Sequence, residues 1–167
     1  TTSVTDIVAR AGVSRATFYN LFDDRLDCFL AANEIAYEVL MASMRQRVED
    51  LETERSLGFE ERISALLTAY LESLASNPGL ARVFLVEVYA AGPKAIEQRR
   101  KAFDEFVNLF LSAQTPASEQ ERMVTEVVVA AVSSFVTNAV AADDIDSLGE
   151  LHAQVMAVVE RLAPFRG

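Results

Sequence analysis

Residues 3–25 read SVTDIVARAGVSRATFYNLFDDR, and this stretch decides how the N-terminal end of the chain folds. Ser3, followed three residues later by Asp6, has the pattern of a helix N-cap with a capping box. The apolar residues that follow recur at helical spacing until Gly12, a residue typical of helix ends. A short helix that ends at Gly12 is therefore predicted.

A second short helix is predicted from Arg15 to Phe22, with Ser14 as its N-cap. Phe18 and Phe22 stand four residues apart and lie on one inward face. Its outward face carries small and polar residues, namely Arg15, Ala16, Thr17, Tyr19 and Asn20. Two short helices joined by a glycine-containing turn indicate either a helix-turn-helix, whose second helix enters a DNA major groove, or a plain helical hairpin of a bundle.

The stretch AGVSRATFYNLFDDR resembles the DNA-binding end of the TetR (tetracycline-repressor type) family of bacterial transcription regulators. In that family a Gly-Val-Ser turn leads into a recognition helix that ends in Tyr-x-x-Phe, and a basic residue opens the next helix. The matching residues are Gly12, Val13, Ser14, Tyr19, Phe22 and Arg25. The resemblance implies a DNA-binding surface of Ser14, Arg15, Ala16, Thr17, Tyr19, Asn20 and Arg25. Of these, Arg15, Ala16 and Asn20 are placed to reach base edges. By the resemblance, Thr17, Tyr19 and Arg25 more often hold phosphates.

The chain begins at Thr1, directly before the first helix of this motif. A helix-turn-helix domain uses a third helix to cover the inner faces of the other two, and the resemblance places that helix before this point. On this expectation, the cover for Ile7, Val8, Phe18 and Phe22 would come from a helix that precedes Thr1. We therefore expect residues 1–27 to form a helix-turn-helix DNA-binding domain that lacks its first helix.

The composition favours a globular helical protein. The chain has 167 residues, of which 51% are hydrophobic, with only six glycines and four prolines. Its net charge of −10 argues against extensive non-specific binding to nucleic acid, because such binding depends on Lys and Arg neutralising phosphates. A single cysteine, Cys28, and the lack of a signal peptide indicate a cytoplasmic protein. The longest uncharged run, 127–142, is short for a membrane span and is predicted to be a buried helix.

An all-α fold is predicted for the whole chain, because no strand pattern of period two occurs. After the motif, helices are predicted over residues 25–51, 59–75, 80–90, 93–112, 118–142 and 147–162. The turn at Thr115-Pro116 separates two of them, and Ser118 with Glu121 forms a capping box. The order and lengths resemble the ligand-binding region of TetR-type regulators, so we expect residues 28–167 to form a helical ligand-binding and dimerisation domain.

A small-molecule site is expected in the larger domain, because a few polar groups among apolar helices are what such a site needs. The expected ligand-binding residues are Tyr70, Phe84, Glu87, Phe103, Phe106, Phe110 and Asn138. Two alternatives stay open: the phenylalanine stripe can be core packing, and Glu87 can face solvent. The effector is expected to be a largely apolar small molecule.

The last two helices are expected to form a homodimer interface. The helix predicted over 118–142 carries apolar residues on too many of its faces for one face to be exposed to solvent. The last helix offers a complementary apolar face. The expected interface residues are Val124, Val128, Ala131, Phe135, Leu151, Val155, Val158 and Leu162.

The sequence does not indicate an enzyme, a metal site or a cofactor. The one histidine, His152, has no partner pattern of a catalytic site, and no zinc spacing or phosphate-binding glycine loop occurs. Acidic residues interleave the basic run around Arg99 and Arg100, which is therefore predicted to be a solvated face.

The favoured function is a ligand-responsive dimeric repressor that binds a pseudo-palindromic operator and is released by a small molecule. The alternative is a helical protein-interaction module.

Overall fold

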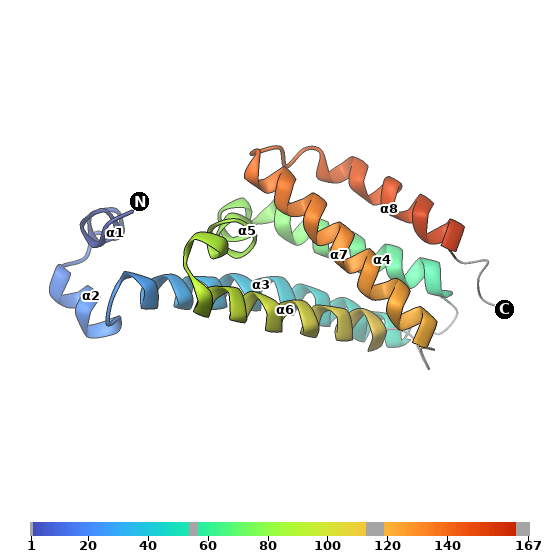
Figure 1. Cartoon of the computed structure of the whole chain (residues 1–167), viewed down its shortest axis with the longest axis horizontal. Helices are drawn as coiled ribbons and strands as arrows, with labels where there is room; N and C mark the ends of the chain where they lie inside the picture. The colour runs from blue at the N-terminus through green and yellow to red at the C-terminus, as the bar shows by residue number, and fades with distance from the viewer. Residues whose placement is uncertain (1, 54–56, 113–118, 163–167) are drawn as a thin grey trace.

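The computed structural model describes residues 2–53, 57–112 and 119–162. Within these ranges the chain forms helices and turns and no strand, so the all-α prediction is confirmed. The helices are α1 (Val4–Ala11), α2 (Arg15–Leu21), α3 (Arg25–Thr53), α4 (Phe59–Ser76), α5 (Pro78–Leu85), the 3-10 helix η1 (Glu87–Ala90), α6 (Pro93–Ser112), α7 (Glu119–Ala141) and α8 (Leu148–Leu162) (Figure 1).

The first two helices begin and end where local chemistry predicts. The Ser3 hydroxyl accepts a hydrogen bond from the Asp6 amide, and the Asp6 carboxylate accepts one from the Ser3 amide at 2.8 Å. Gly12 then ends α1 in the left-handed conformation with φ 66°, which glycine adopts without steric cost. The Ser14 hydroxyl caps α2 by accepting from the Thr17 amide at 3.0 Å. Helix α2 stops at Leu21, one residue earlier than predicted.

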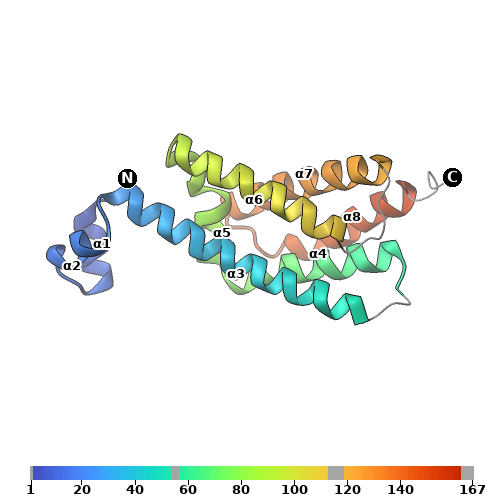
Figure 2. The ribbon, with the colours of Figure 1, turned by 90° about the horizontal axis from the view of Figure 1, so that it is seen from below.

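Helix α3 joins the two ends of the molecule. It has 29 residues and is therefore about 43 Å long at a rise of 1.5 Å per residue. It leaves the helix-turn-helix at Arg25 and runs through the helical body, where it packs against α4, α5 and α6 (Figure 2). The predicted domain boundary at residues 27 and 28 lies inside its first turn.

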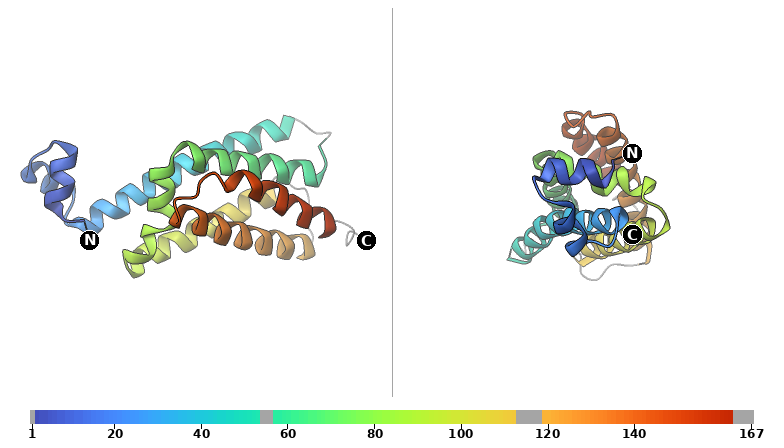
Figure 3. Two further views of the ribbon diagram at one scale, coloured as in Figure 1. Left: turned by 90° about the horizontal axis from the view of Figure 1, so that it is seen from above. Right: turned by 90° about the vertical axis from the view of Figure 1, so that its left-hand side faces the viewer.

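The remaining helices form one bundle beside α3. Helix α8 lies on α4, and α7 lies between α6 and α8 while also contacting α5. Side chains from all of these helices meet in a shared core, whose fully buried members include Met44, Leu66, Leu85 and Val136. The helix-turn-helix stands off one end of this bundle, as the left-hand view in Figure 3 shows.

One predicted helix is divided in the structure. The sequence suggested a single helix over 80–90, but α5 spans Pro78–Leu85 and η1 follows at Glu87–Ala90. Pro78 occupies the first helical turn, where a missing amide is tolerated, so α5 begins earlier than predicted. The predicted turn at Thr115-Pro116 and the cap at Ser118 lie outside the described residues.

Helix α7 is not the buried helix that was predicted. One face packs into the core, but Met123, Val127 and Phe135 on the opposite face are 63%, 61% and 57% exposed. The stretch Arg122–Ala141 is long and apolar enough to cross a membrane by length and composition, although only 28% of its most apolar window is buried. This indication is weak, because core helices of soluble proteins meet the same criterion. Among the described residues, the chain covers only one side of α7.

Candidate DNA-binding face and ligand cavity

Helix α2 presents the predicted DNA-binding residues on an open surface. All seven of them are exposed: Ser14, Arg15, Ala16, Thr17, Tyr19, Asn20 and Arg25. Beneath them Phe18 is only 3% exposed, with its ring 5.3 Å from the Tyr19 ring and 5.4 Å from the Phe22 ring. The buried Phe18 therefore fixes the rotation of α2 and turns its polar face outward.

Two arginines of this face are already held by the chain. The Arg15 guanidinium donates to the Thr5 hydroxyl at 2.7 Å, which ties α2 to α1. Arg25 donates to the Thr2 carbonyl oxygen at 2.9 Å, which ties the start of α3 to the residues before α1. Both cations stay exposed, so each remains accessible to a phosphate or a base edge.

The inward side chains of the two helices are covered to different extents. Val8 is 8% exposed and Phe18 is 3% exposed, while Ile7 and Phe22 are half-buried. Val8 and Phe18 are therefore buried within the described residues, whereas Ile7 and Phe22 keep part of their surface open to solvent.

A cavity lies between α3, α4, α5, α6 and α7, on the body side of the helix-turn-helix. Its lining residues are Tyr37, Leu40, Met41, Tyr70, Phe84, Arg99, Ala102, Phe103, Phe106, Val129 and Ser133. The void is about 10 Å³, room for about one water molecule, so a larger ligand must spread these helices to enter. Four of the seven predicted ligand-binding residues line it: Tyr70, Phe84, Phe103 and Phe106.

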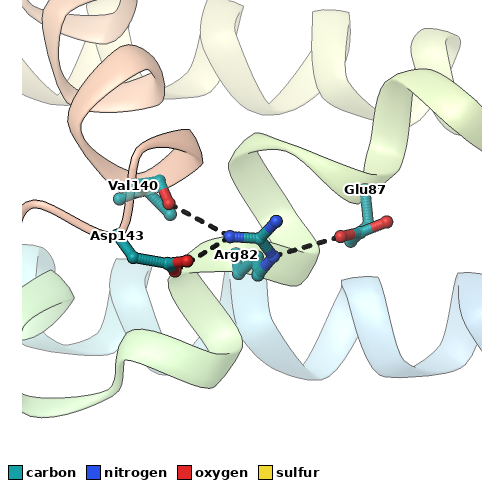
Figure 4. Close-up of polar contacts among 4 residues, drawn as sticks. All are labelled: Arg82, Glu87, Val140 and Asp143. Atoms are coloured by element: carbon teal, nitrogen blue, oxygen red, sulfur yellow. Dashed lines mark hydrogen bonds and ion pairs between the residues drawn. The ribbon is translucent and has the colours of Figure 1, made fainter.

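The other three predicted ligand-binding residues lie elsewhere. Glu87 is exposed and accepts from Arg82 at 3.2 Å, while Arg82 also reaches Asp143 at 3.0 Å and the Val140 carbonyl (Figure 4). Its carboxylate therefore links η1 to α5 on the surface and does not face the cavity. Asn138 is exposed on α7. Phe110 packs against Phe106 in the core, with ring centroids 5.0 Å apart, but it does not line the void.

Arg99 is the main residue that sequence reasoning missed. It was assigned to a solvated face, yet its guanidinium lies 4.7 Å from the centroid of the Phe84 ring and donates to the Ser133 hydroxyl at 2.7 Å. Its Nε is buried and has no hydrogen-bond partner among the described residues. A signal was present, because Arg99 stands four residues before Phe103 and seven before Phe106, on the same face of α6.

Two tyrosines complete the polar part of the cavity. Burial raises the pKa of Tyr70 to about 12, although the charge of Arg99 acts in the opposite direction. Burial, together with a hydrogen bond to Glu105, also raises the pKa of Tyr37, whose hydroxyl donates to the Glu105 carboxylate. Both phenols therefore stay neutral near pH 7 and offer O–H groups.

The predicted dimer residues divide into two groups. Leu151 and Val155 are buried in the chain's own core, where α8 packs on α4, so little of either side chain is left to contact a second copy. Val124 and Val128 are half-buried, whereas Ala131, Phe135 and Val158 are exposed. The Leu162 side chain lies outside the described residues. Met123 and Val127 extend the exposed apolar stripe along α7.

Neither His152 nor Cys28 contributes to a second site. His152 Nε2 lies 3.1 Å from the Ser64 hydroxyl and joins α8 to α4. Cys28 is half-buried, and burial, with a smaller effect from the Asp27 charge, raises the pKa of its thiol. In the described part of the chain, no group of three or more His, Cys, Asp or Glu residues could hold a metal ion.

Comparison with known proteins identifies the N-terminal segment. The model of a family described as "Bacterial regulatory proteins, tetR family" matches residues 1–32, which include α1, α2 and the first turns of α3. No curated protein and no solved structure gives a significant match to the chain.

Proposed function

We propose that this chain, which belongs to the TetR family of bacterial regulatory proteins, is a dimeric repressor that leaves its operator when a small molecule enters the cavity. The family makes it a DNA-binding transcription regulator, and regulators of this family are generally non-enzymatic. The observation that carries the rest is the course of α3. This one continuous helix starts beside the recognition helix and supplies Tyr37, Leu40 and Met41 to the cavity wall.

Ligand binding can reach the DNA-binding end through this helix. A molecule larger than the present void must displace the cavity wall, and α3 carries any tilt to its first turn at Arg25. The protein then has two arrangements, one that binds DNA and one in which α3 is tilted. A ligand can shift the equilibrium between them only if it binds one of them more tightly. A typical coupling free energy of about 1–3 kcal/mol corresponds to a loss of DNA affinity of about 5- to 150-fold.

A homodimer is supported by the uncovered apolar stripe of α7. Met123, Val127 and Phe135 lie at spacings of four and eight residues, hence on one face, and Val158 of the adjacent α8 is 50% exposed. Regulators of this family are usually dimers, and are in general soluble and cytoplasmic, which favours a second copy over a membrane as the cover. A two-fold dimer would present its recognition helices to successive major grooves about 34–36 Å apart.

The first experiment is footprinting of the protein on the DNA that flanks its own gene. We expect protection of a pseudo-palindrome whose half-sites are about one helical turn apart. Binding should weaken as the salt concentration rises, because Arg25 of each protomer displaces counterions when it pairs with a phosphate. If the protein binds no DNA at any salt concentration, the result would instead favour the helical protein-interaction module.

A second experiment tests the coupling to a ligand. A compound library is screened by thermal shift, and each hit is added to the protein–operator complex. Hits should release DNA from the wild type and lose that effect in Phe106→Ala, since Phe106 lines the cavity. Asn138→Ala is the matched control, because Asn138 is exposed and outside the cavity. Hits that stabilise the protein without changing operator affinity contradict the coupling.

A further inference from the structure

The charge of the cavity is set by Arg99. Its guanidinium is half-buried among Phe84, Ser133 and the other lining residues. No carboxylate of the described residues lies within 4.0 Å of it, in contrast to Arg100 on the same helix, which pairs with Glu97 at 3.0 Å and Asp104 at 3.2 Å. The Phe84 ring offsets part of the cationic charge from one side, but it supplies no hydrogen-bond acceptor.

The hydrogen bonds of this arginine are incomplete as well. One terminal nitrogen donates to Ser133, but the buried Nε has no partner among the described residues. A buried donor without an acceptor is unfavourable, and the penalty is larger when the group is charged. An acceptor that carries a negative charge would satisfy both the free N–H and the uncompensated cation.

The remaining walls exclude a highly polar ligand. Tyr70, Phe84, Phe103 and Phe106 provide aromatic surface, and Ala102, Leu40, Met41 and Val129 provide aliphatic surface. The Glu105 carboxylate, which contacts the lining residue Tyr37, already accepts a hydrogen bond from the Tyr37 hydroxyl. Tyr70 also lines the cavity, and its neutral hydroxyl can donate a hydrogen bond.

We propose that the cavity binds an organic carboxylate with an apolar body, its carboxylate pairing with Arg99 and its body lying among the aromatic side chains. This inference rests on the proposed ligand-responsive function, and it specifies the chemical class of the effector. An inward-facing Glu87 carboxylate would instead have favoured a cationic ligand, but Glu87 is exposed and pairs with Arg82. The Arg99 side chain thereby determines both the sign of the ligand charge and the position of the charged group.

The test uses matched probes that differ only in one functional group. 4-Phenylbutyrate, 4-phenylbutanamide and 4-phenylbutylamine, with octanoate, octanamide and octylamine as an aliphatic series, are titrated calorimetrically into the full-length protein without DNA. We expect at least one carboxylate to bind tenfold or more tightly than its amide, and the amines to bind more weakly still. A preference for an amide or an amine, or the absence of binding by all six probes at millimolar concentration, would overturn the proposal.

Substitutions assign the preference to Arg99. In Arg99→Gln, the binding affinities of the carboxylate and the amide should lie within about threefold of each other. Arg99→Lys should retain part of the preference for the carboxylate, because it keeps the positive charge and loses only the forked hydrogen-bond donors of the guanidinium. Arg100→Gln is the matched control, since its side chain is exposed and paired with Glu97 and Asp104. Thermal unfolding of each variant checks that it is folded. An undiminished carboxylate preference in folded Arg99→Gln would refute the assignment.

The outcome for DNA is read separately. If a carboxylate binds through Arg99 but leaves operator affinity unchanged, the ligand class stands and the proposed release mechanism fails. If amines release the operator, the release mechanism stands and the ligand class fails.

Discussion

Arg15 is the side chain of α2 that can combine DNA contact with support of the motif. Its hydrogen bond to Thr5 holds the guanidinium at the surface between α1 and α2, where it stays exposed. A preorganised arginine loses less side-chain entropy when it binds a base edge, and Arg is the commonest residue to pair bidentately with guanine. Tyr19, which is 56% exposed on the same helix, can donate its hydroxyl to a phosphate instead.

Arg15→Ala is expected to weaken operator binding by about 1–3 kcal/mol at particular base pairs, whereas Tyr19→Phe should weaken all sequences similarly. Competition assays with operators that carry single base-pair changes measure the difference. Thr5→Val serves as the control for lost preorganisation, because it removes the Arg15 partner and leaves the arginine in place. An unchanged sequence preference in Arg15→Ala would contradict the assignment of Arg15 to base readout.

Gly12 sets the angle between α1 and α2 through its backbone alone. Its φ of 66° lies in the left-handed region, and an added Cβ would meet no atom within 4 Å, so any penalty comes from the backbone conformation and not from a clash. Gly12→Ala is therefore expected to destabilise the helix-turn-helix by about 1–2 kcal/mol. Hydrogen exchange of α1 and α2 amides, compared with Gly79→Ala, which has a similarly open site and no positive φ, checks this expectation.

Helix α1 depends on one capping box, and this makes its stability sensitive to acid. Hydrogen bonds from the Ser3 side chain, and next from its backbone, lower the pKa of Asp6 below its ordinary value of 3.8. The ionised form is thus favoured in the folded state. The stabilisation is fully present above pH 3.8 and is lost as the pH falls through the lower folded pKa.

We predict that amide protection in α1 declines over this acidic range and that Asp6→Asn removes the pH dependence. The titration of the Asp6 carboxyl group by NMR, together with hydrogen exchange at several pH values, measures both effects. Ser3→Ala is the control, since it removes the first and largest cause of the shift and should move the pKa of Asp6 back toward 3.8. An Asp6 titration that is the same in wild type and Ser3→Ala would contradict the capping account.

At the scale of the whole molecule, the exposed stripe of α7 is the expected site of dimerisation. Val127→Glu and Phe135→Glu should each cost about 2 kcal/mol or more of dimer stability, the range of central apolar contacts. The helix content of each variant should stay unchanged, because both side chains face outward. Light scattering and sedimentation at micromolar concentration measure the change in mass.

Two further variants make this experiment selective. Ile35→Glu is the matched control, since Ile35 is 59% exposed on α3, away from α7 and α8. Val155→Glu should instead lower the free energy of unfolding, because Val155 is 9% exposed within the core of its own chain. A wild type that is monomeric at micromolar concentration would contradict the proposed dimer.

The sequence by itself determined the local features of this protein. Ser3 with Asp6, Gly12 and Ser14 act through hydrogen bonds and backbone preferences within four residues, so their spacing was enough to predict α1, α2 and the exposed polar face of α2. The spacing of the phenylalanines on α6 likewise indicated which face of that helix packs inward. These interactions are short in sequence and do not depend on which other helix lies nearby.

The tertiary structure decided what each face meets. Glu87 and Arg99 are both charged residues beside apolar ones, yet Glu87 pairs with Arg82 at the surface and Arg99 turns into the cavity. Val155 and Val158 are three residues apart on α8, and only the packing of α8 on α4 buries the first and leaves the second exposed. The physical reason is that burial and electrostatic pairing depend on neighbours from distant segments, whereas helical periodicity fixes only which side chains share a face.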